Sequence, residues 1–296
     1  MSTAGPCQTA TSPIDITSTD QVCSKICDYK FSYPLSDCKL SNEGEYLSII
    51  TSNSDNIVTF NNIPYDVVES RLYHPSLHTY NGAHADAELI IQHMGAGGRN
   101  LLVCIPVMGA GGNSKSVDFF NAFVPYAPQN EGTQTNVNVT NWSLGNVIPT
   151  AGYYFYQATA PFPPCTGIYN IVVFDKSSAA QILTEDLPHL TSVISQNSYI
   201  AKNPPSAGFY YNSSGTLAQG GSSSEIYIDC QPVGEEEEEE EIHTYNIPKF
   251  DFQKEELEFK KIMKSKWGRP IILIGSGILL LVLLKKIYDK ALEKLF

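Results

Sequence analysis

Residues 71 to 93 read RLYHPSLHTYNGAHADAELIIQH and contain four of the six histidines of this 296-residue chain. Two segments of strand-like composition flank an Asn-Gly pair that is typical of a tight hairpin turn. Imidazole nitrogens are common ligands of catalytic zinc, which needs three protein ligands around one open coordination position. The stretch therefore raises the question of whether its histidines converge on a metal ion.

The sequence around this stretch, up to about residue 232, predicts a mainly β domain. Short runs of β-branched and aromatic residues recur, such as YLSII at 46–50, LLVCIPV at 101–107 and YNIVVF at 169–174, and Gly, Pro, Asn and Ser clusters separate them. The best helical pattern is AAQILTEDLPHLTSVI at 179–194, which we expect to form a short helix broken near Pro188. Helices are therefore expected only at the periphery.

The charge balance limits the class of partner. The chain carries a formal net charge of -12, and residues 1–234 hold 18 acidic and 8 basic side chains. Because an acidic surface repels polyanions, nucleic acid is disfavoured as a partner.

The C-terminal region differs from the β domain in composition. Seven glutamates at 235–241 cannot collapse against one another, so we expect a solvated linker there. The following segment, KEELEFKKIMKSKW at 254–267, has high helix propensity. It leads into residues 270–284, which carry no charge and would span roughly 22 Å as a helix, against a hydrocarbon layer of roughly 30 Å. Lysines that snorkel at both ends and an interfacial Trp267 extend this length, so we expect a single membrane span.

A buried core helix is the alternative for this apolar segment, and basic residues on both flanks leave the orientation open. The N-terminus lacks the basic and apolar regions of a secretory signal, which predicts a tail-anchored, single-pass membrane protein. The expected organisation is a β domain at 1–233, an acidic linker at 234–252, a juxtamembrane helix at 253–268, a transmembrane helix at 269–286 and a short basic tail at 287–296.

Two further motifs point to a family for the β domain. TSPIDI at 11–16, the opening stretch, and NVIPTAGYYFYQATAPFPPCTGIYNIVVF at 146–174 together resemble the α-carbonic anhydrases in order and separation. That family typically reads QSPIDI, then HFH, PSEHTINGK and ELHLVH, and later YPGSLTTPPC before a WIVF strand. The resemblance covers about residues 7–232. It implies a mainly β (α+β) fold, with a large, twisted, mostly antiparallel central sheet and short peripheral helices.

The resemblance also assigns the family's zinc ligands to positions in this chain. PSLHTYNG at 75–82 and AELIIQH at 87–93 match their family counterparts without a gap. In this register the three zinc histidines fall on Arg71, Tyr73 and Ile90. A guanidinium, a phenol and an alkyl group cannot hold a zinc ion that activates water. The interpretation is a catalytically silent member with no cofactor.

The later motif agrees with this interpretation. The two threonines of the family's LTTPPC segment, which position the zinc-bound hydroxide, fall on Pro161 and Phe162. The glutamate that orients the first threonine falls on Leu77. Proline offers neither a hydroxyl group nor an N–H group. No catalytic residue is therefore assigned.

The surviving histidines are not expected to rebuild a metal site. Side chains alternate along a strand, so His74 points away from the face of Arg71 and Tyr73, and His93 points away from that of Ile90. The resemblance makes His78 and His93 structural, and it makes Glu88 a carboxylate that has lost the metal ligand it would orient. His84 is expected in the hairpin turn.

Two interpretations remain for the former catalytic funnel, whose expected residual pocket consists of Arg71, Tyr73, Leu77, Glu88, Ile90, Pro161 and Phe162. In one interpretation, Arg71 binds an anionic or glycan ligand. In the other, larger side chains have simply filled the pocket. In either case Arg71 is expected to pair with Glu88 or another carboxylate.

Seven cysteines leave at least one thiol unpaired within the chain. The resemblance implies a disulfide between Cys7 and Cys165, because extracellular members of the family pair cysteines at these two places. Cys104 lies in an apolar strand and is expected in the core. The sequence leaves open the pairing of Cys23, Cys27, Cys38, Cys104 and Cys230.

The combination of a silent carbonic-anhydrase-like domain with a C-terminal span looks like the membrane-anchored envelope proteins of large DNA viruses, such as the poxvirus type. That resemblance implies a virion or host-derived membrane, and a module that binds an unknown protein or glycan, or links the membrane to a capsid protein. The poxvirus member binds anionic glycans, and the acidic domain here departs from that pattern. The alternatives are a cellular membrane-bound relative and an active carbonate dehydratase with a non-standard metal site.

Overall fold

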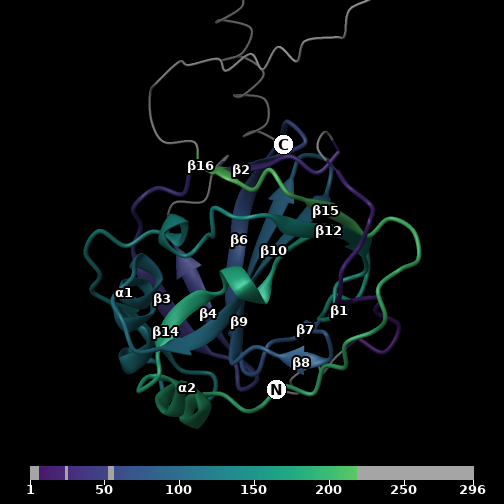
Figure 1. The fold of residues 1–296 in the computed structure, drawn as a ribbon. Coiled ribbons are helices and arrows are strands. Elements are labelled where there is room, and N and C mark those ends of the chain that lie inside the picture. The colour runs from purple at the N-terminus through teal and green to yellow at the C-terminus, as the bar shows by residue number, and fades with distance from the viewer. Residues whose placement is uncertain (1–6, 24–25, 53–56, 219–296) are drawn as a thin grey trace, which may run out of the picture. The chain divides into compact units, whose positions relative to one another are not determined.

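The computed structural model describes residues 7–23, 26–52 and 57–218, and these form a β domain (Figure 1). Its strands are β1 (Asp15–Ile16), β2 (Tyr29–Phe31), β3 (Cys38–Asn42), β4 (Tyr46–Thr51), β5 (Val58–Phe60), β6 (Ile63–Tyr73), β7 (Thr79–Tyr80), β8 (Ala83–His84), β9 (Ala87–Gly95), β10 (Arg99–Ala110), β11 (Gln134–Val137), β12 (Tyr153–Ala158), β13 (Tyr169–Phe174), β14 (Ala180–Leu183), β15 (Tyr210–Asn212) and β16 (Leu217–Ala218). The helices are α1 (Lys115–Asn121) and α2 (Leu187–Val193), with the 3-10 turns η1 (Val124–Tyr126), η2 (Leu144–Asn146) and η3 (Lys176–Ser178).

One large sheet organises the described domain. Its main path runs β11-β3-β4-β6-β9-β10-β13-β12-β15, and β2, β5, β14 and β16 extend it. The long strands β6, β9 and β10 are antiparallel neighbours at its centre, whereas β10 pairs in parallel with β13 and β14. The expected mostly antiparallel sheet is confirmed.

Strands β9 and β10 are buried on both faces of the sheet along most of their length. Every residue of β9 from Ala87 to His93 is buried. One face of the sheet packs against a large core that includes Tyr65, Val67 and Leu72. The other face carries a second core that includes Tyr73 and Ile90, and this is the face of the candidate site.

The helices are short and lie outside the sheet (Figure 1). Ser114 caps α1 by accepting a hydrogen bond from the backbone of Val117. The expected helix at 179–194 is only partly correct. Residues 180–183 form strand β14, and Pro188 lies in the first turn of α2 rather than breaking a helix. The physical reason is that proline lacks an N–H group, which the first turn of a helix does not need.

A hairpin follows the β6 strand, as the Asn-Gly pair predicts. Asn81 and Gly82 adopt φ values of 51° and 79°, and they join β7 to β8, whose last residue is His84. Glycine tolerates such positive φ values because it has no Cβ.

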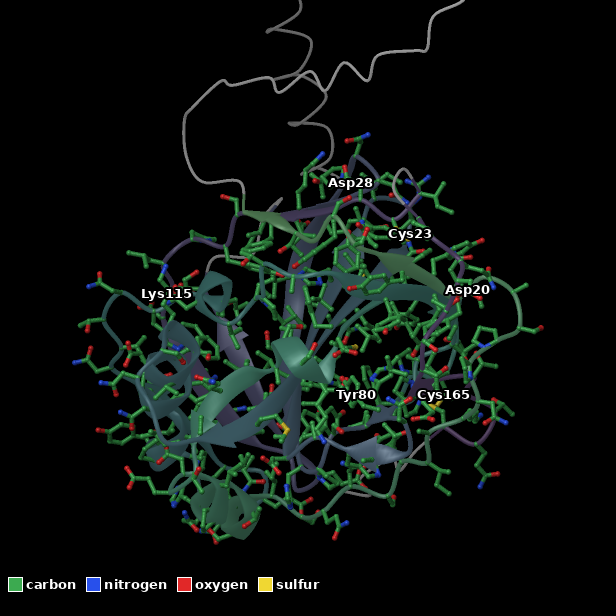
Figure 2. The ribbon with its side chains drawn as sticks, in the orientation of Figure 1. Asp20, Cys23, Asp28, Tyr80, Lys115 and Cys165 are labelled. Carbon is green, nitrogen blue, oxygen red and sulfur yellow. A yellow bond between two sulfur atoms is a disulfide. The ribbon has the colours of Figure 1, made fainter. Side chains whose placement is uncertain are left out.

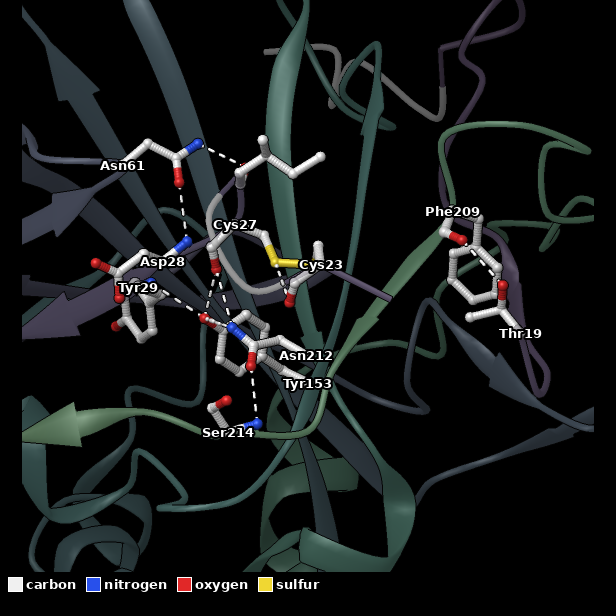
Figure 3. Close-up of a disulfide and its surroundings, with 11 residues drawn as sticks. Thr19, Cys23, Cys27, Asp28, Tyr29, Asn61, Tyr153, Phe209, Asn212 and Ser214 are labelled. Atoms are coloured by element: carbon white, nitrogen blue, oxygen red, sulfur yellow. Dashed lines mark hydrogen bonds between the residues drawn. A yellow bond between two sulfur atoms is a disulfide. The ribbon is translucent and has the colours of Figure 1, made fainter. Parts of the chain in front are cut away.

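The described domain contains two disulfides (Figure 2). Cys7 pairs with Cys165, as expected, and Cys23 pairs with Cys27. The backbone carbonyl of Cys27 accepts hydrogen bonds from the Tyr153 hydroxyl and the Asn212 amide, at 2.5 and 3.3 Å (Figure 3). These contacts hold Cys27 against β12 and β15.

The remaining cysteines of the described domain are free and buried. Cys38 lies in β3 and Cys104 in β10, where it contributes to the core as expected. Burial raises the pKa of the Cys38 thiol to about 12, so this thiol stays protonated and unreactive near neutral pH. Cys230 lies outside the described residues.

The C-terminal predictions also fall outside the described residues. They concern the acidic linker, the juxtamembrane helix, the transmembrane helix at 269–286 and the basic tail, together with the boundary at 233. Within the described ranges, no helix combines the length and apolar composition needed to cross a bilayer.

Candidate functional site

Arg71, Tyr73 and Ile90 lie together on one face of the central sheet. Arg71 in β6 is the register partner of Ile90 in β9. Tyr73 follows Arg71 by two residues on the same strand, so its side chain is on the same face. The three side chains expected at the lost zinc-ligand positions are therefore neighbours.

The Arg71 side chain is enclosed by aromatic rings and a carboxylate. Its guanidinium carbon lies 4.3 Å from the centre of the Phe162 ring and 4.7 Å from that of Tyr46. Its Nε donates to Glu69 at 2.8 Å. Glu69 also accepts a hydrogen bond from Ser48, at 2.6 Å. The carboxylate partner of Arg71 is thus Glu69, two residues earlier on β6, and not Glu88.

Tyr73 and Ile90 are packed into the second core. Tyr73 is fully buried, and its ring lies 5.8 Å from Tyr199, 6.3 Å from Phe162 and 5.2 Å from Tyr46. Burial raises the pKa of the Tyr73 phenol well above its ordinary value, so the hydroxyl group stays protonated at neutral pH. Ile90 is 1% exposed in the same core.

Pro161, Phe162 and Leu77, which stand where the family has its hydroxide-positioning residues, are also buried. Phe162 is 1% exposed and Leu77 is fully covered. The carbonyl of Pro161 accepts a hydrogen bond from the backbone N–H of Cys7 at 2.8 Å. This bond and the Cys7–Cys165 disulfide hold the segment that carries Phe162 over Arg71.

Glu88 orients a histidine instead of a metal ligand. Its Oε1 accepts a hydrogen bond from His78 Nδ1 at 2.6 Å, and its Oε2 accepts from the backbone N–H groups of Leu77 and His78 at 2.6 and 2.9 Å. His78 Nε2 is 2.7 Å from the Tyr156 hydroxyl. Burial alone would raise the pKa of Glu88, but the facing His78 and these hydrogen bonds outweigh it and hold the pKa below its ordinary value.

His78, Glu88 and the nearby Cys104 form a group of potential metal ligands. Donor atoms of His78, Glu88 and Cys104 are within 4.8 Å of one another, and all three side chains are buried. Both ring nitrogens of His78 and both oxygens of Glu88 already have hydrogen-bond partners. Burial raises the pKa of the Cys104 thiol well above its ordinary value, which opposes formation of the thiolate that a metal would bind. This arrangement suits a structural pair better than a metal centre.

The four histidines of the opening stretch go to four separate places. His74 Nδ1 lies 2.8 Å from the carbonyl of Asp86, and His84 Nδ1 lies 2.6 Å from that of Ser76. His93 Nε2 shares a hydrogen bond of 2.8 Å with the Tyr33 hydroxyl. Burial lowers the pKa of His93 to about 3, so it is neutral at physiological pH.

A small cavity of about 220 Å³ opens beside Arg71. We call it the Arg71 cavity, and it is lined by Glu43, Glu45, Tyr46, Arg71, Phe162, Pro163 and Tyr199. Of the residues expected in a residual pocket, Arg71 and Phe162 line it. Tyr73, Leu77, Glu88, Ile90 and Pro161 are buried and do not line it. Sequence reasoning missed the rim residues Glu43 and Glu45, because no family motif covers them.

Comparisons with known proteins give the fold. No protein-family profile matches the chain, and no curated protein sequence matches it. Among solved structures, the α-carbonic anhydrase of Thermovibrio ammonificans in complex with sulfanilamide aligns with a TM-score of 0.57 and 20% identity, over 69% of this chain and 86% of that one. The chain has the fold of the α-carbonic anhydrases.

Other solved structures extend this finding. The α-carbonic anhydrase of Photobacterium profundum aligns with a TM-score of 0.59 and 16% identity, over 69% of this chain and 89% of that one. Dioscorin complexed with ascorbate aligns with a TM-score of 0.55 and 18% identity, over 71% of this chain and 87% of that one. At such identities the likeness establishes the carbonic-anhydrase fold, and function must be argued from the site.

Proposed function

We propose that this chain is a non-enzymatic interaction module with the carbonic-anhydrase fold. In this proposal a C-terminal span anchors it in a membrane, and it serves as a minor virion membrane protein that binds a protein or glycan partner or links the membrane to a capsid. The domain then acts as a rigid binding platform.

The environment of Arg71 carries the non-enzymatic part of the proposal. A zinc ion that activates water needs three converging donors, an open fourth position and room for substrate. In the expected register the corresponding side chains are an arginine stacked on Phe162, a buried tyrosine and a buried isoleucine. The Arg71 guanidinium, paired with Glu69 at 2.8 Å, also has no lone pair to offer a metal ion.

The membrane and virion parts rest on the sequence. Residues 270–284 carry no charge, lysines and Trp267 flank them, and the acidic run at 235–241 separates them from the β domain. The virion assignment is supported by the resemblance to membrane-anchored carbonic-anhydrase-like envelope proteins. Detection of the chain in purified particles, and its retention there after alkaline carbonate washing, would test both parts.

The competing function is carbonate dehydration with a non-standard metal. One observation favours it, namely the proximity of His78, Glu88 and Cys104. A metal there would need to displace the hydrogen bonds of His78 to Glu88 and Tyr156. Because the cluster is fully buried, carbon dioxide and water would also lack access to it.

A carbon dioxide hydration assay separates the two functions. The full-length chain, purified in detergent with and without added zinc, should leave the hydration rate at the uncatalysed background. An α-carbonic anhydrase treated in the same detergent is the positive control. Turnover that depends on metal and disappears with a chelator would contradict the proposed function.

A further inference from the structure

The Arg71 cavity has more carboxylates than cations around it. Glu43 and Glu45 line it, and Glu69 forms the ion pair with Arg71 at 2.8 Å. Glu43 accepts a hydrogen bond from Ser41 at 2.5 Å. Among the described residues, neither Glu43 nor Glu45 forms an ion pair. Because Glu69 compensates Arg71, the charges of Glu43 and Glu45 remain available to a ligand.

This charge balance selects the ligand class. An anion that approached Arg71 would lie close to the two uncompensated carboxylates on the rim, which disfavours it. A cation finds two carboxylates with no competing ion pair, and charge-assisted hydrogen bonds to carboxylates are roughly twice as strong as neutral ones. The cavity therefore favours a positively charged group.

The aromatic walls favour the same class. Tyr46 and Phe162 already hold one cation, the Arg71 guanidinium, at 4.7 and 4.3 Å from their ring centres. Tyr199 contributes a third ring to the lining. Burial raises the pKa of Tyr199 to about 12, with a smaller contribution from the negative charge of Glu45. Tyrosine rings attract cations through their electron-rich faces.

The size of the cavity limits the ligand. Its volume of about 220 Å³ is below the range of about 300–1,000 Å³ that is typical of small-molecule and cofactor sites. A single amino-acid side chain fits this space better than an oligosaccharide or a cofactor does. The acidic net charge of -12 would favour the approach of a basic partner.

We propose that the Arg71 cavity receives a lysine or arginine side chain of a partner protein, held by Glu43 and Glu45 and by the ring of Tyr199. The inference rests on the proposed function, because it takes the former funnel as a binding surface. It narrows the partner from a protein or glycan to a protein with an exposed basic segment.

Peptide binding to the full-length chain in detergent tests this site. The probe is fluorescein-labelled Gly-Lys-Gly-Lys-Gly, followed by fluorescence anisotropy, with the norleucine counterpart as the uncharged control. We expect the lysine peptide to bind at least tenfold more tightly than the norleucine peptide. The double substitution Glu43→Gln with Glu45→Gln should remove this preference.

A matched control separates the site from general charge attraction. Asp20 and Glu185 are exposed and lie outside the Arg71 cavity, so Asp20→Asn with Glu185→Gln removes the same charge and should change the affinity less than threefold. Tyr199→Leu, which changes no charge, should weaken binding several-fold. Equal losses of peptide affinity in the two double variants would overturn the proposal. Stronger binding of neutral methyl glycosides or of chondroitin sulfate than of the lysine peptide would also overturn it.

Failure of the proposed cation site can be distinguished from failure of the proposed function. Specific peptide binding together with zinc-dependent turnover would leave the cation site standing and overturn the non-enzymatic role. No turnover and no preference for the lysine peptide would overturn the cation site alone.

Discussion

Arg71 and Phe162 are stacked, with the guanidinium carbon 4.3 Å from the centre of the phenyl ring. In the expected register, Arg71 is at the place of a zinc-binding histidine and Phe162 is at that of a threonine that positions the hydroxide. The two replacements therefore contact each other. Together with the ion pair between Arg71 and Glu69, this contact accommodates the arginine charge on this face of the sheet.

Restoring three histidines should create a zinc site if the assigned positions converge. The variant Arg71→His, Tyr73→His and Ile90→His should bind about one zinc ion per chain, because Arg71 and Ile90 are register partners and Tyr73 shares their face. Metal analysis after dialysis against zinc is the measurement.

Each variant with only two of the three histidines is the control, and it should bind zinc at least tenfold more weakly. Removing the buried Tyr73 ring should also lower the free energy of unfolding by about 3 kcal/mol or more. A triple variant that folds and takes up no zinc would refute the assigned positions.

The two disulfides should contribute unequally to stability. The Cys7–Cys165 bond joins residues 158 apart, and the Cys23–Cys27 bond joins residues 4 apart. On the chain-entropy model, the first contributes about 5 kcal/mol and the second about 2 kcal/mol. Urea denaturation of Cys7→Ser with Cys165→Ser, compared with Cys23→Ser with Cys27→Ser, measures the difference. Equal losses would show that loop entropy does not govern these bonds.

The His78–Glu88 pair should stabilise the fold as a unit. Glu88→Gln leaves a buried imidazole without its carboxylate and should cost about 3–5 kcal/mol of unfolding free energy. His78→Gln should cost a similar amount, because it leaves the carboxylate without its partner.

A double-mutant cycle measures the coupling of this pair. The double variant should lose at least about 1 kcal/mol less than the sum of the two single losses. Strict additivity in denaturant titrations would mean that the two side chains act independently.

Stability should fall in mild acid because of His93. Its pKa is about 3 in the folded state and 6.5 in the unfolded state. Between these values the unfolded chain binds a proton that the folded chain does not. The contribution of neutral His93 to the free energy of unfolding is therefore complete above pH 6.5. It is lost as the pH falls toward 3, at up to about 1.4 kcal/mol per pH unit.

The variant His93→Gln isolates this contribution. Its unfolding free energy should depend less on pH than that of the wild type between pH 6.5 and 4.5. Below that range, protonation of Glu88 adds a second loss in both proteins, because its pKa is lowered in the folded state. Parallel pH profiles for wild type and variant would exclude His93 as the source.

Much of the fold could be predicted from the sequence because its motifs are local and ordered. Matches on both sides of the hairpin turn fixed the alignment with the family, which assigned Arg71, Tyr73 and Ile90 to the ligand positions, and the structure pairs Arg71 in β6 with Ile90 in β9. The Cys7–Cys165 bond followed from the same resemblance. The Cys23–Cys27 bond could not be predicted, because a spacing of four residues between two cysteines does not show that they pair with each other.

The β-bulge that precedes Glu69 could not be predicted, although strand alternation alone places Glu69 on the face of Arg71, two residues later in β6. A register shift between Val67 and Glu69 places Val67 in the large core, while Glu69 shares the face of Arg71. A β-bulge of this kind reverses the alternation of side chains, and no glycine marks it in the sequence. The rim of the Arg71 cavity was equally hidden, because Glu43 and Glu45 lie in the turn between β3 and β4, whereas Tyr199 lies far along the chain between α2 and β15.

The zinc content of the purified full-length chain tests the central claim most directly. After dialysis against excess zinc and then against buffer, we expect well below 0.1 zinc ion per chain, roughly a tenth or less of the one-to-one stoichiometry of a catalytic site. One tightly held zinc ion per chain, lost on Arg71→Ala or Tyr73→Phe, would contradict the account.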